Sequence, residues 1–98
     1  MTSTVSHNLR HLIFERDSYT CALCQAAATD AHHIKPRSLG GRNHPHNLIS
    51  LCRAHHCYIH GARLIGQALS REDSRQALIE YLHDYYAVEI ERGEFCGV

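Results

Sequence analysis

The side chains best suited to chemistry in this sequence are histidines and cysteines, and they are concentrated between Cys21 and His60. That segment holds seven of the ten histidines and four of the five cysteines. Thiolate sulfur and neutral imidazole nitrogen are the ligands that zinc and similar divalent ions prefer. The spacing divides these residues into a set that would enclose an ion and a set that would leave it open. We therefore expect a structural metal site beside a catalytic one.

The closed site is predicted from two short ligand pairs. Cys21 and Cys24 are separated by two residues. Cys52 and His55 have the same spacing, and Cys52 lies 28 positions after Cys24. Two such pairs can turn onto one tetrahedral ion, which gives a Cys3His zinc site with no vacant position. A redox Cys-x-x-Cys motif and simple buried thiols are the alternatives, although no strand-then-helix pattern surrounds Cys21. Cys57 fits neither pair and is expected to be a packed helix residue.

The open site is predicted from three further histidines. His56 and His60 are four residues apart, so they share one face of a helix and can bind one ion together. His32, on a predicted strand, is the natural third ligand. Three neutral imidazoles leave the charge of the ion uncompensated and its other positions open to water and phosphate. His33 points to the opposite face of the strand from His32, which suits a general base held beside the ion.

Hydrophobic periodicity predicts the elements that would position these ligands. Leu9, Leu12 and Ile13 recur at helical spacing, which predicts a short helix over residues 7–17. The segment between the two expected strands is rich in glycine and proline and is predicted to be a loop. The elements expected around the sites are, in order, the helix, a strand over 31–34, a loop over 35–46, an antiparallel strand over 48–51 and a helix over 53–61.

A longer amphipathic helix is predicted from about residue 71 to 91. Ser70 and Asp73 before it resemble a capping box in which Asp replaces the usual Glu or Gln. One face is apolar at positions i, i+3, i+4 and i+7, formed by Leu78, Tyr81, Leu82 and Tyr85. This face could pair two chains into a homodimer or bind a partner protein, but covering the small core is the preferred interpretation.

Length and composition limit the function classes. A chain of 98 residues is expected to be a single domain, 1–98, that gains from a stabilising metal. The sequence shows no export signal and no apolar run that could span a membrane, so a cytoplasmic protein without a membrane partner is expected. The net charge is zero, yet residues 1–69 carry seven Lys/Arg against three acidic residues. Because this basic part holds the motifs, it could attract phosphate.

The order of these motifs resembles that of the HNH endonuclease family. Cys-x-x-Cys, His-His-Ile-x-Pro-x-Ser-x-Gly-Gly, Asn-Leu-Ile-x-Leu-Cys, and His-His with a further His occur in sequence over about residues 10–60. The resemblance implies an α+β fold of the ββα-metal type, stabilised here by the added Cys3His zinc. It also implies an enzyme that hydrolyses phosphodiester bonds in DNA. Its cofactors would be one structural Zn²⁺ and one catalytic divalent ion, Mg²⁺, Mn²⁺, Ni²⁺ or Zn²⁺.

The resemblance also implies a role for each matched residue. His33 matches the histidine that activates water, and Asn47 matches the asparagine that pins the loop and helps to orient that base. His56 matches the last histidine of the family name and would bind the catalytic ion with His32 and His60. Four basic side chains that flank the site would hold the DNA backbone without reading its sequence, namely Lys35, Arg37, Arg42 and Arg53.

Some alternatives remain open. His55 stands where zinc-bearing family members have a fourth cysteine, and His55 and His56 could exchange roles. The chain could also be a non-catalytic, zinc-stabilised module that binds nucleic acid or protein, or a nuclease that needs a partner. A hydrolase of small substrates is disfavoured because nothing indicates a substrate pocket. His44 and His46, in the loop, are expected to lie on the surface.

Overall fold

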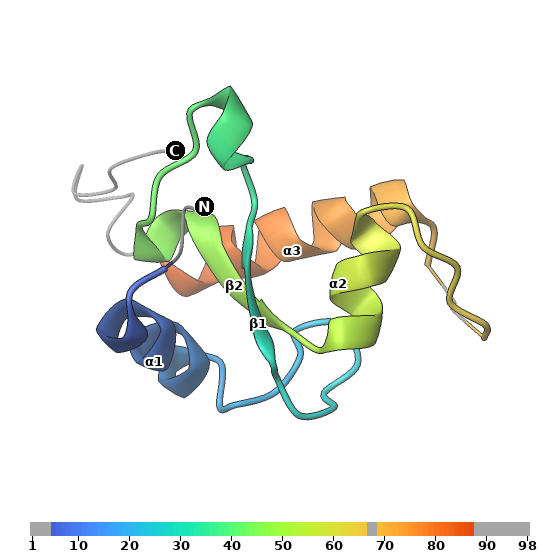
Figure 1. Cartoon of the computed structure of the whole chain (residues 1–98), viewed down its shortest axis with the longest axis horizontal. Helices are drawn as coiled ribbons and strands as arrows, with labels where there is room; N and C mark the ends of the chain where they lie inside the picture. The colour runs from blue at the N-terminus through green and yellow to red at the C-terminus, as the bar shows by residue number, and fades with distance from the viewer. Residues whose placement is uncertain (1–4, 67–68, 88–98) are drawn as a thin grey trace.

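The computed structural model describes residues 5–66 and 69–87 of the chain. These residues form an α+β arrangement of three α-helices and a two-stranded antiparallel sheet (Figure 1). The main elements are α1 (His7–Arg16), β1 (Asp30–His33), β2 (Leu48–Leu51), α2 (Arg53–Ile59) and α3 (Arg71–Tyr85). The predicted order of helices and strands is therefore confirmed.

The sheet positions one histidine pair and three of the buried core residues, Leu48, Ile49 and Leu51. β1 and β2 pair antiparallel, with His32 opposite Ile49 and His33 opposite Leu48. All four residues of β2 are buried, whereas buried and half-buried residues alternate along β1. The segment between the strands was predicted to be a loop throughout, but it contains two short 3₁₀ turns, η1 (Arg37–Leu39) and η2 (Pro45–Asn47).

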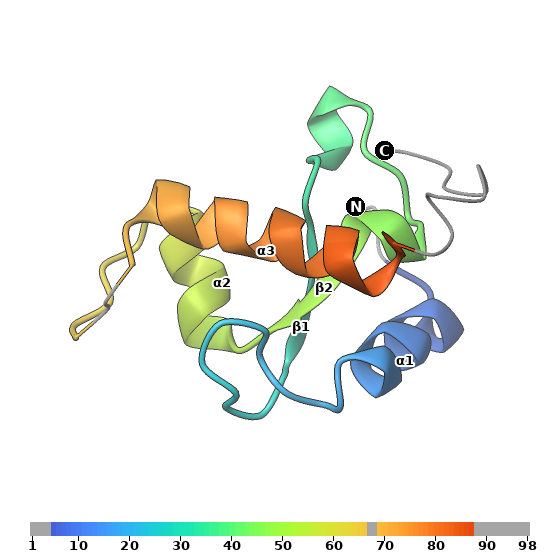
Figure 2. The same cartoon turned by 180° about the vertical axis from the view of Figure 1, so that it is seen from behind.

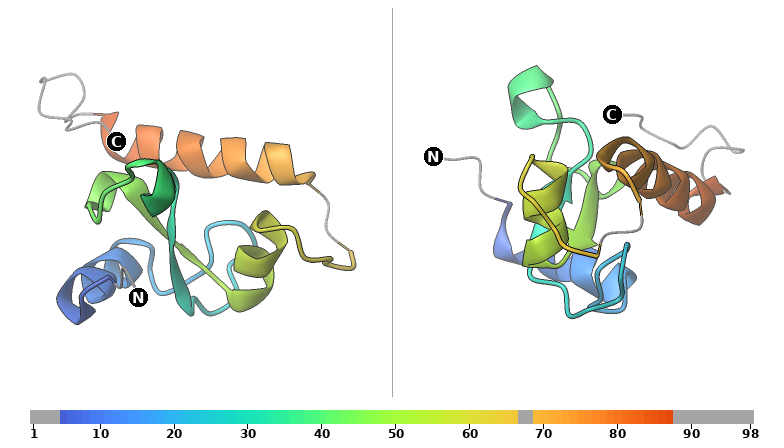
Figure 3. Two further views of the ribbon diagram at one scale, coloured as in Figure 1. Left: turned by 45° about the horizontal axis from the view of Figure 1, so that its top comes forward. Right: turned by 90° about the vertical axis from the view of Figure 1, so that its right-hand side faces the viewer.

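Helix α3 covers the small core. It crosses the sheet from the end near α2 to the end near α1 (Figure 2). Further views show that α2 and α3 lie side by side (Figure 3). Leu78 and Leu82 are buried in the same cluster as Ile49, Leu51 and Ile59. The prediction that the apolar face of this helix covers the core is thus confirmed for Leu78 and Leu82. Tyr85, at the end of that face, is half exposed.

The N-terminus of α3 begins as predicted, but its C-terminus does not lie where it was predicted. The Ser70 side chain accepts a hydrogen bond from the backbone N–H of Asp73, as the capping pattern predicts. At the other terminus α3 ends at Tyr85, short of the predicted extent to about residue 91, and residues 88–91 lie outside the described residues. The ring of Tyr86, the C-cap, packs on His46, and its hydroxyl accepts a hydrogen bond from Arg16. These contacts join the end of α3 to η2 and to α1.

A buried ion pair joins the helices to the sheet. The Asp17 carboxylate accepts two hydrogen bonds from Arg16, one from the Ser50 backbone N–H and one from the Tyr81 hydroxyl. Burial alone would raise the pKa of Asp17, but the hydrogen bonds and charge of Arg16 bring it below its usual value. Burial, followed by the hydrogen bond to Asp17, raises the pKa of Tyr81 to about 12. This carboxylate is therefore ionised at neutral pH and fixes α3 against α1.

Candidate metal centres

The first candidate centre is the Cys3His cluster predicted from the sequence. Cys21 and Cys24 lie in the turn between α1 and β1, while Cys52 is the N-cap of α2 and His55 lies in its first turn. One potential ligand atom from each of the four lies within 4.8 Å of those of the others. The fold thus brings together two ligand pairs that are far apart in the chain.

The distances within the Cys3His cluster fit a single tetrahedral ion. The sulfurs of Cys24 and Cys52 are 3.8 Å apart, and the Cys52 sulfur lies 3.5 Å from Nδ1 of His55. Zinc with sulfur at about 2.3 Å and nitrogen at about 2.0 Å would separate these pairs by about 3.8 Å and 3.5 Å. A disulfide would need about 2.0 Å, which excludes one between Cys24 and Cys52. This cluster could hold a zinc ion.

The two thiols of the first ligand pair in the Cys3His cluster differ in pKa. Burial, followed by the hydrogen bond with Cys21, raises the pKa of Cys24 to about 11. Burial opposes ionisation of Cys21 as well, but backbone N–H groups around its sulfur bring its pKa below the usual value. Metal binding requires both sulfurs as thiolates, and a cation between them would offset their mutual repulsion.

The second candidate centre consists of three histidines from two elements. His32 comes from β1, His56 from α2, and His60 from the C-cap of α2. The ring centroids form a nearly equilateral triangle with sides of 5.2, 5.4 and 4.9 Å. One nitrogen of each ring lies within 4.8 Å of one nitrogen of the others. His32 is buried and His60 is exposed, so this three-histidine cluster opens to solvent on one side.

Two of the three histidines in the cluster are shifted toward the neutral form that a metal requires. Burial, followed by the positive charges of His56 and His60, lowers the pKa of His32 to about 3. Burial and the charge of His56 also lower the pKa of His60. Nδ1 of His32 is buried without a hydrogen-bond partner among the described residues, a costly state that an ion ligated there would relieve. The three residues therefore fit a divalent ion with open coordination positions.

Asp30 orients one of the three histidines and was not predicted from the sequence. Its buried carboxylate accepts a hydrogen bond of 2.8 Å from Nδ1 of His56 and two from the Arg53 guanidinium. The Arg53 hydrogen bonds, followed by the hydrogen bond and charge of His56, outweigh burial and lower the pKa of Asp30 to about 2. The hydrogen bond at Nδ1 leaves Nε2 of His56 for the ion. Asp30 precedes His32 by two residues on a strand, and this spacing could have revealed it.

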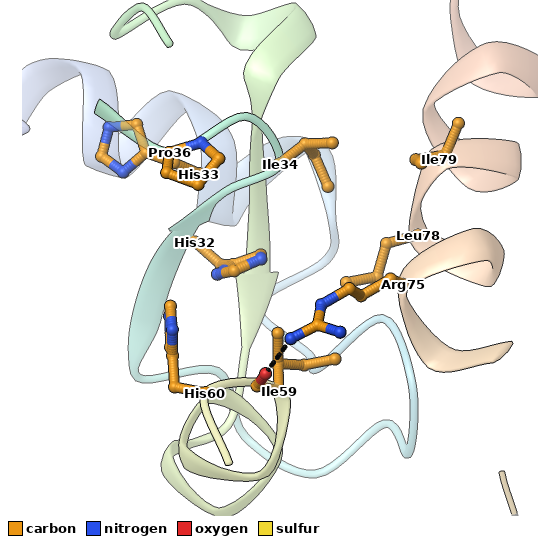
Figure 4. Close-up of a pocket in the computed structure, with 9 residues that line it drawn as sticks. All are labelled: His32, His33, Ile34, Pro36, Ile59, His60, Arg75, Leu78 and Ile79. Carbon is orange, nitrogen blue, oxygen red and sulfur yellow. Dashed lines mark hydrogen bonds between the residues drawn. The ribbon is translucent and has the colours of Figure 1, made fainter. Parts of the chain in front are cut away.

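His33 is held apart from the three-histidine cluster. Its ring is turned away from His32 and His60 in Figure 4, although it lines the same hollow. Nε2 of His33 lies 2.7 Å from Oδ1 of Asn43. Because an amide oxygen can only accept, Nε2 carries the hydrogen, and Nδ1 is free of one. Asn43 therefore sets the tautomer in which His33 can take up a proton, and no motif of the sequence indicated this residue.

Asn47 pins the loop between the strands. Its fully buried side chain accepts from the backbone N–H of Lys35 and donates to the carbonyl oxygens of Lys35 and Arg42. The loop is so tight that a Cβ on Gly41 would lie 1.7 Å from the carbonyl oxygen of Lys35. These hydrogen bonds go to the loop backbone, so Asn47 can support His33 only indirectly, through the loop that carries Asn43.

The four predicted phosphate-binding residues differ in their surroundings. Lys35, Arg37 and Arg42 are exposed on the loop between the strands. Arg53 is exposed too, but its guanidinium makes a two-pronged ion pair with Asp30. Its charge is thus balanced within the protein, whereas the three loop residues remain the better placed to meet a phosphate.

Two surface predictions are wrong. His46 is buried, because η2 directs its ring against Tyr86 at a centroid distance of 4.2 Å. Cys57 is exposed rather than packed. It follows the buried His55 by two residues, which on an α-helix places it on nearly the opposite side.

Comparison with known proteins adds nothing to this geometry. No protein-family model matches the chain, and no curated protein matches it either. None of the helices in the described part of the chain is long and apolar enough to cross a bilayer. The two clusters and the residues around them are therefore the features that indicate a function.

Proposed function

We propose that this chain is a metal-dependent DNA endonuclease of the HNH type, in which the Cys3His cluster holds a structural zinc ion. The observation that carries the proposal is the three-histidine cluster, open to solvent at His60, with His33 held off it by Asn43. Two strands followed by a helix, with the ligands on the first strand and on the helix, also support the ββα-metal assignment.

The chemistry divides between the three ligands and His33. His32, His56 and His60 would hold the divalent ion, which when bound would stabilise the charge that develops on the phosphate and on the leaving oxygen. His33 accepts the proton of a water at Nδ1 while the oxygen of that water forms a bond to phosphorus. The bond from phosphorus to the 3′ oxygen breaks, giving a 5′-phosphate and, after protonation, a 3′-hydroxyl.

The surroundings of the site favour a polyanionic substrate. Lys35, Arg37 and Arg42 would hold backbone phosphates, and such contacts position DNA without reading its sequence. Three nitrogen ligands suit Zn²⁺ and Ni²⁺ better than Mn²⁺ and Mg²⁺, which favour oxygen ligands. We therefore rank Zn²⁺ and Ni²⁺ ahead of Mn²⁺ and Mg²⁺ for the catalytic site.

The test is incubation of the zinc-loaded protein with supercoiled plasmid and each divalent ion in turn, with EDTA as the blank. We expect metal-dependent nicking or linearisation that disappears in His33→Ala and in His56→Ala. His33→Ala should still bind the second ion, whereas His56→Ala should not, as isothermal titration would show. Equal loss of metal in both variants would make His33 a ligand rather than the base.

The alternative is a zinc-stabilised module that binds nucleic acid or protein without cleaving anything. The Cys3His cluster and the exposed basic loop favour this alternative. A non-catalytic module does not, however, explain the hydrogen bond from His56 to Asp30. It would be supported by folded, zinc-loaded protein that binds DNA and cuts it with none of the four ions.

Dimerisation and cellular location remain predictions. Because Leu78 and Leu82 lie in the core of a single chain, a second copy or a partner protein would have to use other residues of α3, such as the exposed Ile79 and Tyr85. The expectation of a cytoplasmic protein is kept as part of the proposal.

A further inference from the structure

A hollow adjoins the three-histidine cluster on the side of α3 (Figure 4). Its volume is about 170 Å³, and both His32 and His60 line it. Part of its wall is apolar and includes Ile34, Pro36 and the partly exposed Ile79. Sites that enclose a small molecule usually measure about 300–1,000 Å³. The hollow therefore suits one portion of a larger ligand that continues into solvent.

One cation from outside the motif segment reaches this hollow. Arg75, on α3, lines it together with the two histidines. Its Nη2 donates to the carbonyl oxygen of Ile59 over 2.6 Å, and Ile59 immediately precedes His60. Figure 4 shows the guanidinium reaching from α3 toward Ile59 beside His32. This hydrogen bond therefore holds the positive charge of Arg75 close to the three-histidine cluster.

The charge of Arg75 is not balanced by a carboxylate among the described residues. In contrast, Arg16 pairs with Asp17 and Arg53 pairs with Asp30. A guanidinium has five N–H donors in a planar fork that matches phosphate oxygens. The hydrogen bond to Ile59 uses one of the five. The others remain for a ligand.

Attachment of α3 to α2 does not by itself require Arg75. Arg71, one helical turn earlier, donates to the carbonyl oxygens of Tyr58 and Ala62, and its guanidinium lies over the Tyr58 ring. Arg71 thus attaches α3 to the C-terminal end of α2 with two hydrogen bonds and does not line the hollow. The two arginines share a helix and a structural contact, and they differ in access to the cluster.

We propose that Arg75 binds a backbone phosphate of DNA at the three-histidine cluster, while the adjoining deoxyribose lies against the apolar wall of the hollow. This inference rests on the proposed nuclease function and extends its substrate contacts to α3. It makes Arg75 a substrate-binding residue. The contact is to phosphate and sugar, so it would hold DNA of any sequence.

The test compares Arg75→Gln with the matched control Arg71→Gln, both in the full zinc-loaded chain. Binding of a short fluorescent duplex is measured by anisotropy over a range of KCl concentrations, in the His33→Ala background with Mn²⁺ so that DNA is not cut. Each phosphate contact that is lost should reduce the salt slope, d log K/d log[KCl], by about 0.9. We expect that reduction for Arg75→Gln and none for Arg71→Gln, which should instead show the greater loss of melting temperature.

Cleavage rates provide a second measurement. With His33 intact, Arg75→Gln should cut plasmid at least tenfold more slowly than Arg71→Gln, and Arg75→Lys should keep the salt slope because it keeps the charge. Equal salt slopes and equal cleavage rates for the two Gln variants would overturn the role of Arg75. If the protein without substitutions cuts plasmid, that result would leave the nuclease proposal intact. Failure of the unsubstituted protein to cut or bind DNA with any ion would overturn both proposals.

Discussion

Replacement of Asp30 by asparagine should weaken metal binding at the three-histidine cluster while leaving the Cys3His cluster loaded. The carboxylate accepts a hydrogen bond from His56 and two from Arg53. Asp30→Asn keeps the shape of the side chain but removes its charge and one of its two acceptors. The hydrogen bond to His56 then becomes neutral, and the ring loses the partner that makes Nε2 a stronger ligand.

The size of the effect follows from the position of Asp30 behind a ligand. Loss of such a supporting group typically lowers metal affinity 10–100-fold, which corresponds to about 1.4–2.7 kcal/mol. The ion pair with Arg53 contributes less to metal binding, because the Arg53 side chain is 72% exposed and ion pairs in such positions are weak. Arg53→Gln should therefore change metal affinity far less than Asp30→Asn.

The assay is isothermal titration of zinc-loaded protein with Ni²⁺, with bound zinc measured before and after. Asp30→Asn should bind Ni²⁺ 10–100-fold more weakly than the unsubstituted protein and retain one equivalent of zinc. A change of less than threefold would refute the idea that Asp30 tunes His56. An equal loss in Arg53→Gln would assign the effect to the ion pair instead.

Three other perturbations probe the rest of the molecule. Cys24→Ser should abolish stoichiometric zinc binding and strongly lower the melting temperature, because the Cys3His cluster joins the N-terminal turn to α2; an unchanged melting temperature would contradict a structural zinc. Asp17→Asn should cost about 3–5 kcal/mol in urea denaturation, because it leaves Arg16 buried without its counter-charge. The folded-state pKa of Asp17 lies below its unfolded value. The difference in free energy of unfolding between the unsubstituted protein and Asp17→Asn should therefore be complete above about pH 4 and disappear as pH falls through the folded-state pKa. A difference that stays constant below pH 4 would contradict this prediction. Asn43→Ala should slow plasmid cleavage and leave Ni²⁺ affinity unchanged if Asn43 acts only by orienting His33, whereas an unchanged rate would remove it from the mechanism.

The features that could be predicted from the sequence are those with a local period. His56 and His60 share a helix face because they are four residues apart, and His32 and His33 separate because a strand alternates. The same reasoning predicted both strands and their antiparallel pairing. Even the burial of Leu78 in the core follows from helical spacing on α3.

The features that could not be predicted are contacts between distant residues with no local pattern. Tyr81 donates to Asp17 across 64 positions of the chain, and His33 meets Asn43 across a loop whose path depends on the buried Asn47. Tyr86, the C-cap of α3, packs on His46 and accepts a hydrogen bond from Arg16, which lies 70 positions earlier in the chain. Such pairs form only once the chain has folded, so a single sequence shows each partner but not the pairing.

Consecutive residues of α2, His55 and His56, belong to the two different clusters. If both clusters bind metal, the order of loading is constrained, because the helix that carries two ligands of the open site starts from the zinc-bound Cys52. If the chain is also the proposed nuclease, apo protein would have to acquire zinc before it could become active. A chelator that strips zinc from the Cys3His cluster would then abolish cleavage even in an excess of the second ion. Under the same proposal, zinc supply would control when the chain becomes able to cut DNA.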